Sequence, residues 1–478
     1  MVDFLSSMVL IGLIGQTAVG LGYLISSIRE REKRASFFAG VQFLTMAGAL
    51  VLFVYCWASD FLATAFGFGI LICLLAGGIT AGFMLIRKTP ANQTALAGTQ
   101  GLITGDVKPF DERDVVFARN RTIRPGSEQY KAYYQMRPEY EQIDAARREK
   151  GGPLGQPGLI DKPKDRPNVA ATFSSQGIAM HLSAPAAFHP GAHAVLQGHR
   201  VEMSPSEASR RVKGYTLNIG ARLVGITEIN PLWVYSRRGE IFRENWEDWG
   251  RAIEVDHKYA IVFATEMAFE LVGTAPHTPT TIASMGNYAE GAFIATQLAA
   301  YIANLGYSAT ANHLRHYDAL LVPLAVDAGL GEVGRLGYLM TRDHGPRVRL
   351  GAVTTDLPLV PDRPVDIGVE DFCNMCKKCA SCCPSSSIPL DDRTEVNGTL
   401  RWTLNAETCF DYWGKVGTDC NVCMRVCPWS HANSFPHKVI RALITRNRLS
   451  RKLFHLMDDI FYGRKPRPKA GPEWAQYE

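Results

Sequence analysis

The sequence predicts three membrane-spanning helices, then an α/β (α+β) core with a mixed sheet and a small cysteine-rich module near the C-terminus. Residues 1–90 hold three long apolar stretches, strand-like and helix-like segments alternate after residue 170, and nine of the 11 cysteines fall between positions 373 and 427. The expected segments are an anchor (1–90), a connector wrapping the core (91–169), the core (170–365), the cysteine module (366–440) and a C-terminal extension (441–478).

The apolar stretches cover residues 8–28, 37–57 and 61–86. Each reaches the roughly 20 residues needed to cross a hydrocarbon layer. A signal peptide followed by buried core helices is the alternative, but no small-residue cleavage signature follows the first stretch. The sequence therefore favours three membrane helices.

Basic residues near the helix ends predict the orientation, because cytoplasmic loops retain Lys and Arg. They are Arg29, Arg31, Lys33 and Arg34 in the first connection, and Arg87 and Lys88 after the third helix. The N-terminal segment and the second connection carry none. We expect a multi-pass protein of the cytoplasmic (inner) membrane, with everything after Lys88 on the cytoplasmic face. Export is the alternative, since Lys33-Arg34 before "ASFF" faintly resembles a twin-arginine signal, although the paired arginines are missing.

Composition indicates a folded protein and excludes one class of function. Of the 478 residues, 46% are hydrophobic and 10% aromatic, which supports a large core. The formal net charge is +5, with acidic and basic residues nearly balanced, so no electrostatic footprint for nucleic acid is present. We expect no nucleic-acid partner.

The core prediction comes from alternating patterns. Residues 258–269 form a short β-rich apolar run, residues 289–305 are good helix formers stopped by Gly306, and residues 348–359 alternate as a strand does. Strands alternating with helices argue for an α/β arrangement. The connector is rich in Pro, Gly and charge, with one short helix expected between irregular segments.

The cysteines form two motifs, C-x-x-C-x-x-C-x-x-x-C-P and C-x10-C-x-x-C-x-x-x-C-P. Such spacings hold cuboidal [4Fe-4S] clusters, and in bacterial two-cluster ferredoxins the Cys before Pro ligates the other cluster. The expected ligand sets are Cys373, Cys376, Cys379 and Cys427 for one cluster, and Cys409, Cys420, Cys423 and Cys383 for the other. Zinc does not call for the doubled C-x-x-x-C-P ending. Cys382 is expected to be a non-ligand, although it could exchange roles with its neighbour Cys383.

Residues 322–384, from "VPLAVDAGLGEVGR" to "CNMCKKCASCCP", and "WGKVGTDCNVCMRVCPWS" (413–430) resemble the corrinoid-dependent reductive dehalogenases. The resemblance is close over residues 256–430 and loose before them. It implies a base-off cobalamin beside the nearer cluster, whose low-valent cobalt attacks or captures an organohalide. In that family a separate three-helix protein is the usual anchor. Here the resemblance implies an anchor fused to the enzyme, with a similar Glu-x-Glu (Glu30, Glu32) in the first connection.

The same resemblance implies catalytic residues. Tyr288 matches the family's proton donor, and Arg349 matches the cation that makes it acidic, with Arg347 as an alternative. Where the family has "ND", this chain has His316-Tyr317, and His316 is the expected third polar partner. The alternatives assign no catalytic role. Tyr288 would then be a core residue with a hydrogen-bonded hydroxyl, and Arg349 would be a charge on the surface of a strand.

We therefore expect an oxidoreductase, a membrane-anchored reductive dehalogenase with cobalamin and two [4Fe-4S] clusters. One alternative is an enzyme similar to epoxyqueuosine reductase, which normally has "AGLGW-x-GK" where this chain has "AGLGEVGR" (328–335). The other is a non-catalytic membrane electron-transfer subunit. Expected partners are an organohalide and membrane lipid. The expected electron donor is a quinol or a ferredoxin-type protein. A haem-bearing anchor is excluded, because residues 1–90 contain no His to bind haem. The oligomeric state stays open, with a homo-oligomer as one option.

Overall fold

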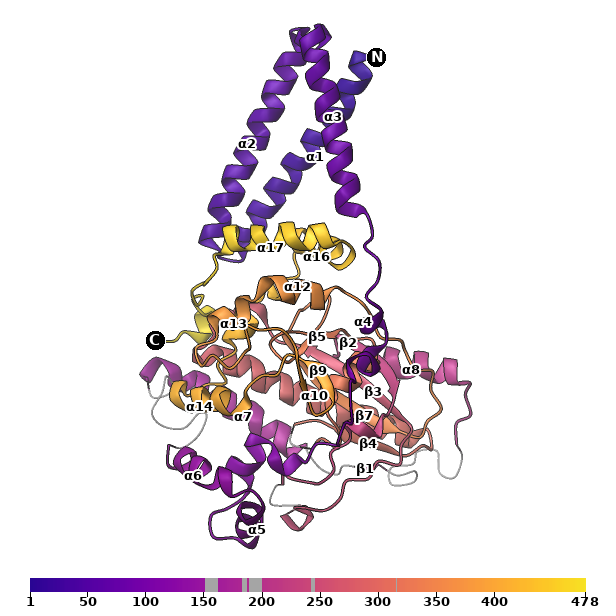
Figure 1. Ribbon diagram of the computed structural model, residues 1–478, viewed down its shortest axis with the longest axis vertical. Coiled ribbons are helices and arrows are strands. Elements are labelled where there is room, and N and C mark those ends of the chain that lie inside the picture. The colour runs from indigo at the N-terminus through magenta and orange to yellow at the C-terminus, as the bar shows by residue number, and fades with distance from the viewer. Residues whose placement is uncertain (151–161, 183–186, 189–199, 242–245, 315) are drawn as a thin grey trace. The chain divides into compact units, whose positions relative to one another are not determined.

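The computed structural model describes residues 1–150, 162–182, 187–188, 200–241, 246–314 and 316–478 (Figure 1). The chain forms two compact units, each built from segments that are distant in the sequence. Unit 1 consists of Met1–Ala91, Asp371–Cys376 and His431–Arg467. Unit 2 consists of Asn92–Glu370, Lys377–Ser430 and Pro468–Glu478.

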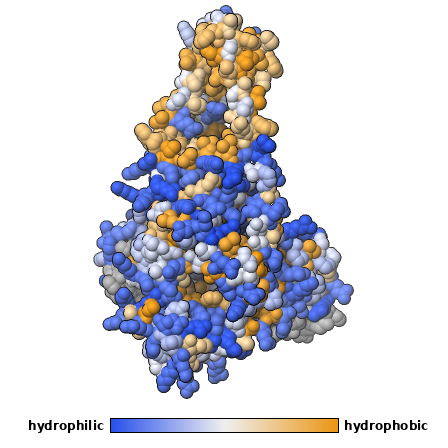
Figure 2. Space-filling view, in the orientation of Figure 1, coloured by the Kyte–Doolittle hydropathy of each residue, from blue (hydrophilic) through white to orange (hydrophobic). Residues whose placement is uncertain are grey.

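Unit 1 contains the three predicted apolar helices, α1 (Val2–Arg29), α2 (Lys33–Ala58) and α3 (Ala65–Ile86). All three are long and apolar enough to cross a membrane. Hydrophobic side chains dominate their outer surface (Figure 2). This exposure suits contact with lipid, because water would not stabilise so much uncovered apolar area.

Two C-terminal helices, α16 (Phe435–Arg446) and α17 (Arg448–Tyr462), complete unit 1. Asn447 joins them and caps α17, since its side-chain oxygen accepts from the Ser450 N–H at 3.0 Å. Its amide nitrogen donates to the Met84 carbonyl at 2.7 Å, which ties the helix pair to the end of α3. Phe461 packs against Ala35 and Ala39 of α2.

Unit 2 is built on a five-stranded sheet with the order β1-β4-β7-β3-β2. The strands are β1 (Ala187–Phe188), β2 (Leu223–Glu228), β3 (Tyr259–Glu266), β4 (Ala309–Asn312) and β7 (Val348–Thr355). The predicted combination of helices with a sheet is confirmed, but the four pairings between these described strands are all antiparallel rather than mixed. Side-chain alternation specifies which face of a strand is buried and not the direction of its neighbour.

Helices cover both faces of this sheet. Along β3, Ile261 and Phe263 pack on the face that contacts α10 (Thr278–Asn304) and α8 (Pro205–Asn218). Ala260, Val262 and Ala264 face α11 (Leu321–Asp327) on the other side. The two-residue period explains why the strand reads as continuously apolar, because both faces are buried. Helix α7 (Arg166–His181) packs along α10.

The remaining elements of the chain are short. The connector stretch expected to hold one helix forms two, α5 (Glu128–Met136) and α6 (Glu141–Glu149), after the single turn α4 (Gln93–Leu96). The cysteine module contains α12 (Val369–Cys376), α13 (Lys378–Cys382), β8 (Thr394–Val396), β9 (Thr399–Arg401), α14 (Ala406–Val416) and α15 (Val422–Arg425). Helix α9 (Phe269–Val272) and the hairpin β5 (Glu332–Val333) and β6 (Leu339–Met340) complete the set.

Candidate functional site

Four cysteines from separate parts of the sequence line one pocket of unit 2. They are Cys383, which follows α13, Cys409 on α14, Cys420, which precedes α15, and Cys423 on α15. The pocket comprises about 430 Å³ of space, part of it open to solvent, and Tyr338 and Asp419 also line it. These four cysteines are one of the two ligand sets expected from the sequence. Cys382 does not line the pocket.

The chemistry of these thiols fits an iron–sulfur cluster. Burial raises the pKa of Cys409 to about 11 and that of Cys420 to about 12, and neighbouring thiols add to both shifts. Four thiolates lining one pocket would repel one another, so a bound cation is needed to hold them ionised. The Cys383 sulfur accepts a hydrogen bond from the Ser387 N–H, with 3.3 Å between nitrogen and Sγ.

The arrangement of the four cysteines also distinguishes a cluster site from a site for a single metal ion. Within the part of the chain that the structure describes, no three His, Cys, Asp or Glu side chains gather closely enough to hold one metal ion. A single zinc would draw its sulfurs to ~2.3 Å from one centre. A cuboidal cluster instead gives each thiolate its own iron, which suits four cysteines spread around a pocket.

The second expected ligand set is divided between the two compact units. Cys373 and Cys376 lie on α12 in unit 1, and Cys379 and Cys427 belong to unit 2. All four are buried, with relative exposures of 6 to 8%. Their role as ligands stays a prediction from their spacing.

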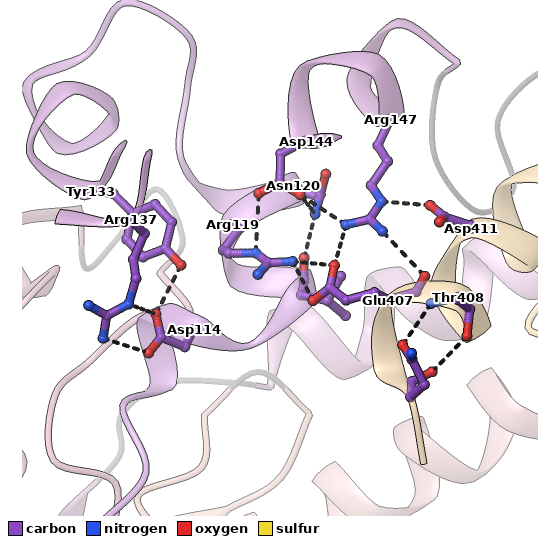
Figure 3. A network of polar contacts seen from close by, with 12 residues as sticks. Asp114, Arg119, Asn120, Tyr133, Arg137, Asp144, Arg147, Glu407, Thr408 and Asp411 are labelled. Carbon is purple, nitrogen blue, oxygen red and sulfur yellow. Dashed lines mark hydrogen bonds and ion pairs between the residues drawn. The ribbon is translucent and has the colours of Figure 1, made fainter. Parts of the chain in front are cut away.

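Helix α14, which carries Cys409, is held by buried arginines of the connector (Figure 3). Arg119 donates to both carboxylate oxygens of Glu407 at 2.7 Å, and Arg147 contacts Glu407 at 2.5 Å and Asp411 at 2.6 Å. Asp144 lies between the two guanidinium groups and pairs with both. Because Glu407 and Asp411 flank Cys409 on either side, this network fixes the helix that presents the thiol.

Tyr288 and Arg349, which the sequence separates by sixty residues, lie together. Tyr288 is on α10 and Arg349 is on β7. The guanidinium carbon of Arg349 lies 5.3 Å from the centroid of the Tyr288 ring, within the range of a cation–π interaction. The positive charge of Arg349 therefore faces the ring of Tyr288.

Arg349 also connects this tyrosine to the cysteine pocket. Its Nη2 donates to Ser284 Oγ at 2.8 Å and lies 3.6 Å from Asp419 Oδ2. Asp419 precedes Cys420, and its carboxylate accepts from Thr281 Oγ1 at 3.2 Å. The chain thus brings Tyr288, Arg349 and the residue before Cys420 into one region.

Two further tyrosines surround Arg349. Burial raises the pKa of Tyr338 and of Tyr317 well above the usual range, and the nearby Arg349 acts in the opposite direction on both. Sequence reasoning missed both residues. The available signal for Tyr317 was its position beside His316 in the segment that departs from the family pattern.

His316 and Arg347 have other surroundings. Burial lowers the pKa of His316, and the charges that act on it come from Asp318, Arg238 and two more residues of the 238–251 segment. Arg347 is fully buried and donates to the Ser430 carbonyl at 2.7 Å, and it pairs with Glu266 at 3.2 Å. Of the two candidate arginines, Arg349 is therefore the one beside Tyr288.

A second described pocket of unit 2 comprises about 470 Å³ of space, part of it open to solvent, and is lined by residues such as Leu102, Glu332, Arg393 and Trp402. None of the predicted site residues lines it. The chemistry-bearing side chains gather instead at the cysteine pocket.

Comparison with known proteins supports this picture. Residues 372–431 match the family model "4Fe-4S dicluster domain". The chain is 32% identical to a tetrachloroethene reductive dehalogenase of Desulfitobacterium hafniense over 281 residues, 50% of this chain and 51% of that protein. It is 33% identical to the enzyme of the same name from Sulfurospirillum multivorans over 292 residues, 55% of this chain and 58% of that one. The chain thus spans about half the length of these curated relatives.

The solved structure of a variant of the catabolic reductive dehalogenase NpRdhA shares the fold. The TM-score is 0.59 at 24% identity, over 79% of this chain and 52% of that one. An epoxyqueuosine reductase of Cyclobacterium marinum is 33% identical over a shorter stretch, 24% of this chain and 37% of that protein. The predicted resemblance to reductive dehalogenases is confirmed.

Proposed function

We propose that the protein is a membrane-anchored reductive dehalogenase that replaces a halogen of an organohalide by hydrogen. The observation that carries this proposal is the Arg349–Tyr288 pair, joined through Asp419 to a pocket lined by four cysteines. The reaction takes up two electrons and one proton and releases halide. Two [4Fe-4S] clusters would deliver the electrons one at a time.

The chain's own residues supply and control the proton. Tyr288 is the proposed donor of the proton that takes the place of the halogen. Arg349 stabilises the phenolate that remains, because its charge faces the ring at 5.3 Å in a buried setting where electrostatic interactions are strong. Asp419 and Ser284 hold the guanidinium in place. His316 remains the proposed third polar partner.

A base-off cobalamin, which the resemblance implies, would supply a low-valent cobalt that is reactive toward a carbon–halogen bond. Two buried atoms beside the candidate pair fit a bound polar group, namely Arg349 Nε and Asn287 Oδ1. Neither has a hydrogen-bond partner among the described residues. Buried polar atoms are rarely left unpaired, so a ligand at this place would satisfy them.

The three apolar helices are the proposed anchor in the cytoplasmic membrane, with the catalytic part on the cytoplasmic face. This orientation rests on the six basic residues at the ends of the helices. The electron donor is proposed to be a quinol or a ferredoxin-type protein.

Metal analysis and halide release test the proposal on the purified full-length protein, handled without oxygen. We expect about one cobalt and about eight iron atoms per chain, and halide release from brominated phenols with reduced viologen as donor. Two clusters without cobalt or halide release would favour an electron-transfer subunit. Turnover of an epoxyqueuosine-containing RNA in place of organohalides would favour the reductase alternative.

A further inference from the structure

The C-terminal helix pair of unit 1 lies where the apolar helices end. Asn447, between α16 and α17, donates to the carbonyl of Met84 in the last turn of α3. At the other end of α17, Phe461 packs against Ala35 in the first turn of α2. If each apolar helix spans the membrane once, the start of α2 and the end of α3 lie on the same side of it. Helix α17 therefore runs across the ends of these helices (Figure 1).

One side of α17 is apolar and exposed. Four large side chains, each 40 to 60% exposed, recur at intervals of three and four residues and so share one face: Leu449, Leu453, Leu456 and Ile460. Helix α16 adds Phe435 and Val439, which are 73% and 42% exposed. Ser450 and Phe461 are buried on another face of α17, which packs within unit 1. A regular apolar stripe left uncovered in this way marks an interaction surface.

The same segment is strongly basic. Residues 431–467 contain nine Lys and Arg against two Asp, whereas the whole chain has a net charge of +5. Both acidic residues have basic partners, since Asp458 pairs with His431 and Asp459 pairs with Arg464. Several cations of the two helices are exposed, namely Lys438, Arg446, Arg448 and Lys452. The surplus of positive charge is therefore concentrated on the helix pair that also carries the apolar stripe.

We propose that α16 and α17 form a second membrane contact, in which the apolar stripe enters the edge of the lipid layer and the cations bind anionic phospholipid headgroups. An apolar face combined with Lys and Arg is typical of helices that lie in the plane of a membrane surface. Long basic side chains can keep their stems against apolar neighbours while their charges reach the headgroups. The inference rests on the proposed membrane anchor and not on the proposed reaction.

The position of the pair favours lipid over a second protein as the partner. Because α17 is tied to the ends of α2 and α3, its exposed stripe lies beside lipid in the anchored protein. Anionic headgroups attract basic residues only within about one Debye length of the surface, and α17 meets this condition. Asp371 of α12 pairs with Arg448 and Arg451 of α17, so the contact also holds α12 near the membrane.

Leu453→Trp tests the apolar contact in the full-length protein, reconstituted into liposomes whose phospholipid acyl chains carry bromine. Bromine quenches an indole that it touches. The emission that the new Trp adds to that of the eight natural ones should therefore fall by roughly half or more relative to unbrominated liposomes. Leu217→Trp on α8 is the matched control, because Leu217 is exposed to a similar extent, and its added emission should be equal in both liposomes.

A triple variant, Lys438→Gln, Arg446→Gln and Lys452→Gln, tests headgroup binding. Trace amounts of spin-labelled phosphatidylglycerol or phosphatidylcholine report which lipid is immobilised at the protein surface. The wild type should prefer the anionic lipid, and the triple variant should lose at least roughly fivefold of this preference, the change that one cation near a charged membrane produces. The control is the double variant Arg210→Gln and Arg211→Gln on α8, which should keep the preference of the wild type.

Separate measurements cover folding, the anchor and the reaction. Iron content should match the wild type in every variant, and release of the wild type from membranes by alkaline carbonate would overturn the anchor together with this contact. With the wild type retained in the membrane, an unquenched Leu453→Trp, equal quenching of Leu217→Trp, or an unchanged lipid preference of the triple variant would overturn the contact. The expected quenching without any halide release by the wild type would overturn the proposed reaction and leave the contact standing.

Discussion

Arg349 on β7 lies over the ring of Tyr288 on α10, with 5.3 Å between the guanidinium carbon and the ring centroid. The same guanidinium reaches Asp419, the residue before Cys420. Arg349 thus contacts both the candidate acid and the residue before Cys420. A substitution at Tyr288, Arg349 or Asp419 should therefore affect the other two side chains.

Replacing Tyr288 by Phe keeps the ring over Arg349 and removes the acidic proton. We expect viologen-driven halide release to fall by roughly 10²- to 10⁴-fold, as for loss of a general acid, with iron and cobalt contents unchanged. Full activity in this variant would rule out Tyr288 as the proton donor.

The Asp419→Asn variant removes the carboxylate partner of Arg349 at 3.6 Å and leaves that cation buried. An uncompensated buried charge costs roughly 3 to 5 kcal/mol, so thermal unfolding should occur at a clearly lower temperature. The exposed pair Arg211–Glu207 offers a control, because Arg211→Ala should change stability by only about 0 to 1 kcal/mol. Equal effects of the two substitutions would contradict the assigned role of Asp419.

Replacing Cys423 by Ser removes one thiolate from the cysteine pocket. Iron content should fall from about eight to about four atoms per chain, and the electron paramagnetic resonance spectrum should lose one of its two interacting centres. Cys382→Ser is the matched comparison and should retain all the iron, since Cys382 does not line the pocket. Loss of iron from the Cys382 variant would instead exchange the roles of Cys382 and Cys383.

Asp144→Ala leaves Arg119 and Arg147 with fewer partners in a site where Arg119 and Asp144 are fully buried. Destabilisation of roughly 3 to 5 kcal/mol is expected. The more specific readout is the redox potential of the cluster that Cys409 is proposed to ligate, because without Asp144 more of the positive charge of Arg119 and Arg147 acts on Glu407 and Asp411 beside it. A potential identical to that of the wild type would confine the network to a purely structural role.

Stability at low pH should depend on Glu266. Burial alone would raise its pKa, but His344 and Arg347 outweigh burial and lower the pKa from 4.5 to about 2. The folded state therefore binds this proton less readily than the unfolded state. The stabilisation is complete above pH 4.5 and is lost as the pH falls toward about 2. The melting temperature of Glu266→Gln should vary less over this range than that of the wild type.

The sequence predicted features that depend on local spacing. The apolar stretches became α1, α2 and α3, and the C-x-x-C spacings identified the cysteines that line the pocket. Both signals lie within a few tens of residues, where chain geometry alone constrains the outcome. Strand direction was not accessible in this way, because one strand's alternation contains no information about its partner.

The contacts around the candidate site needed the tertiary structure. Pairing of Tyr288 with Arg349 was expected only from the family resemblance, and neither spacing nor composition identified Asp419 as the residue that joins the pair to the cluster loop. The sequence predicted a mostly irregular connector. The connector nevertheless supplies the buried Arg119 and Arg147, which fix α14. Such long-range ion pairs leave no periodic trace in a sequence.

The polypeptide passes from one compact unit to the other five times. Cys373 and Cys376 belong with the apolar helices, while Cys379 and Cys427 belong to the other unit. Cutting the chain after residue 91 would therefore not release a self-contained soluble enzyme. The cut would remove the apolar helices against which α16 and α17 pack. Cys373 and Cys376, half of one expected ligand set, would remain in a unit that has lost these helices.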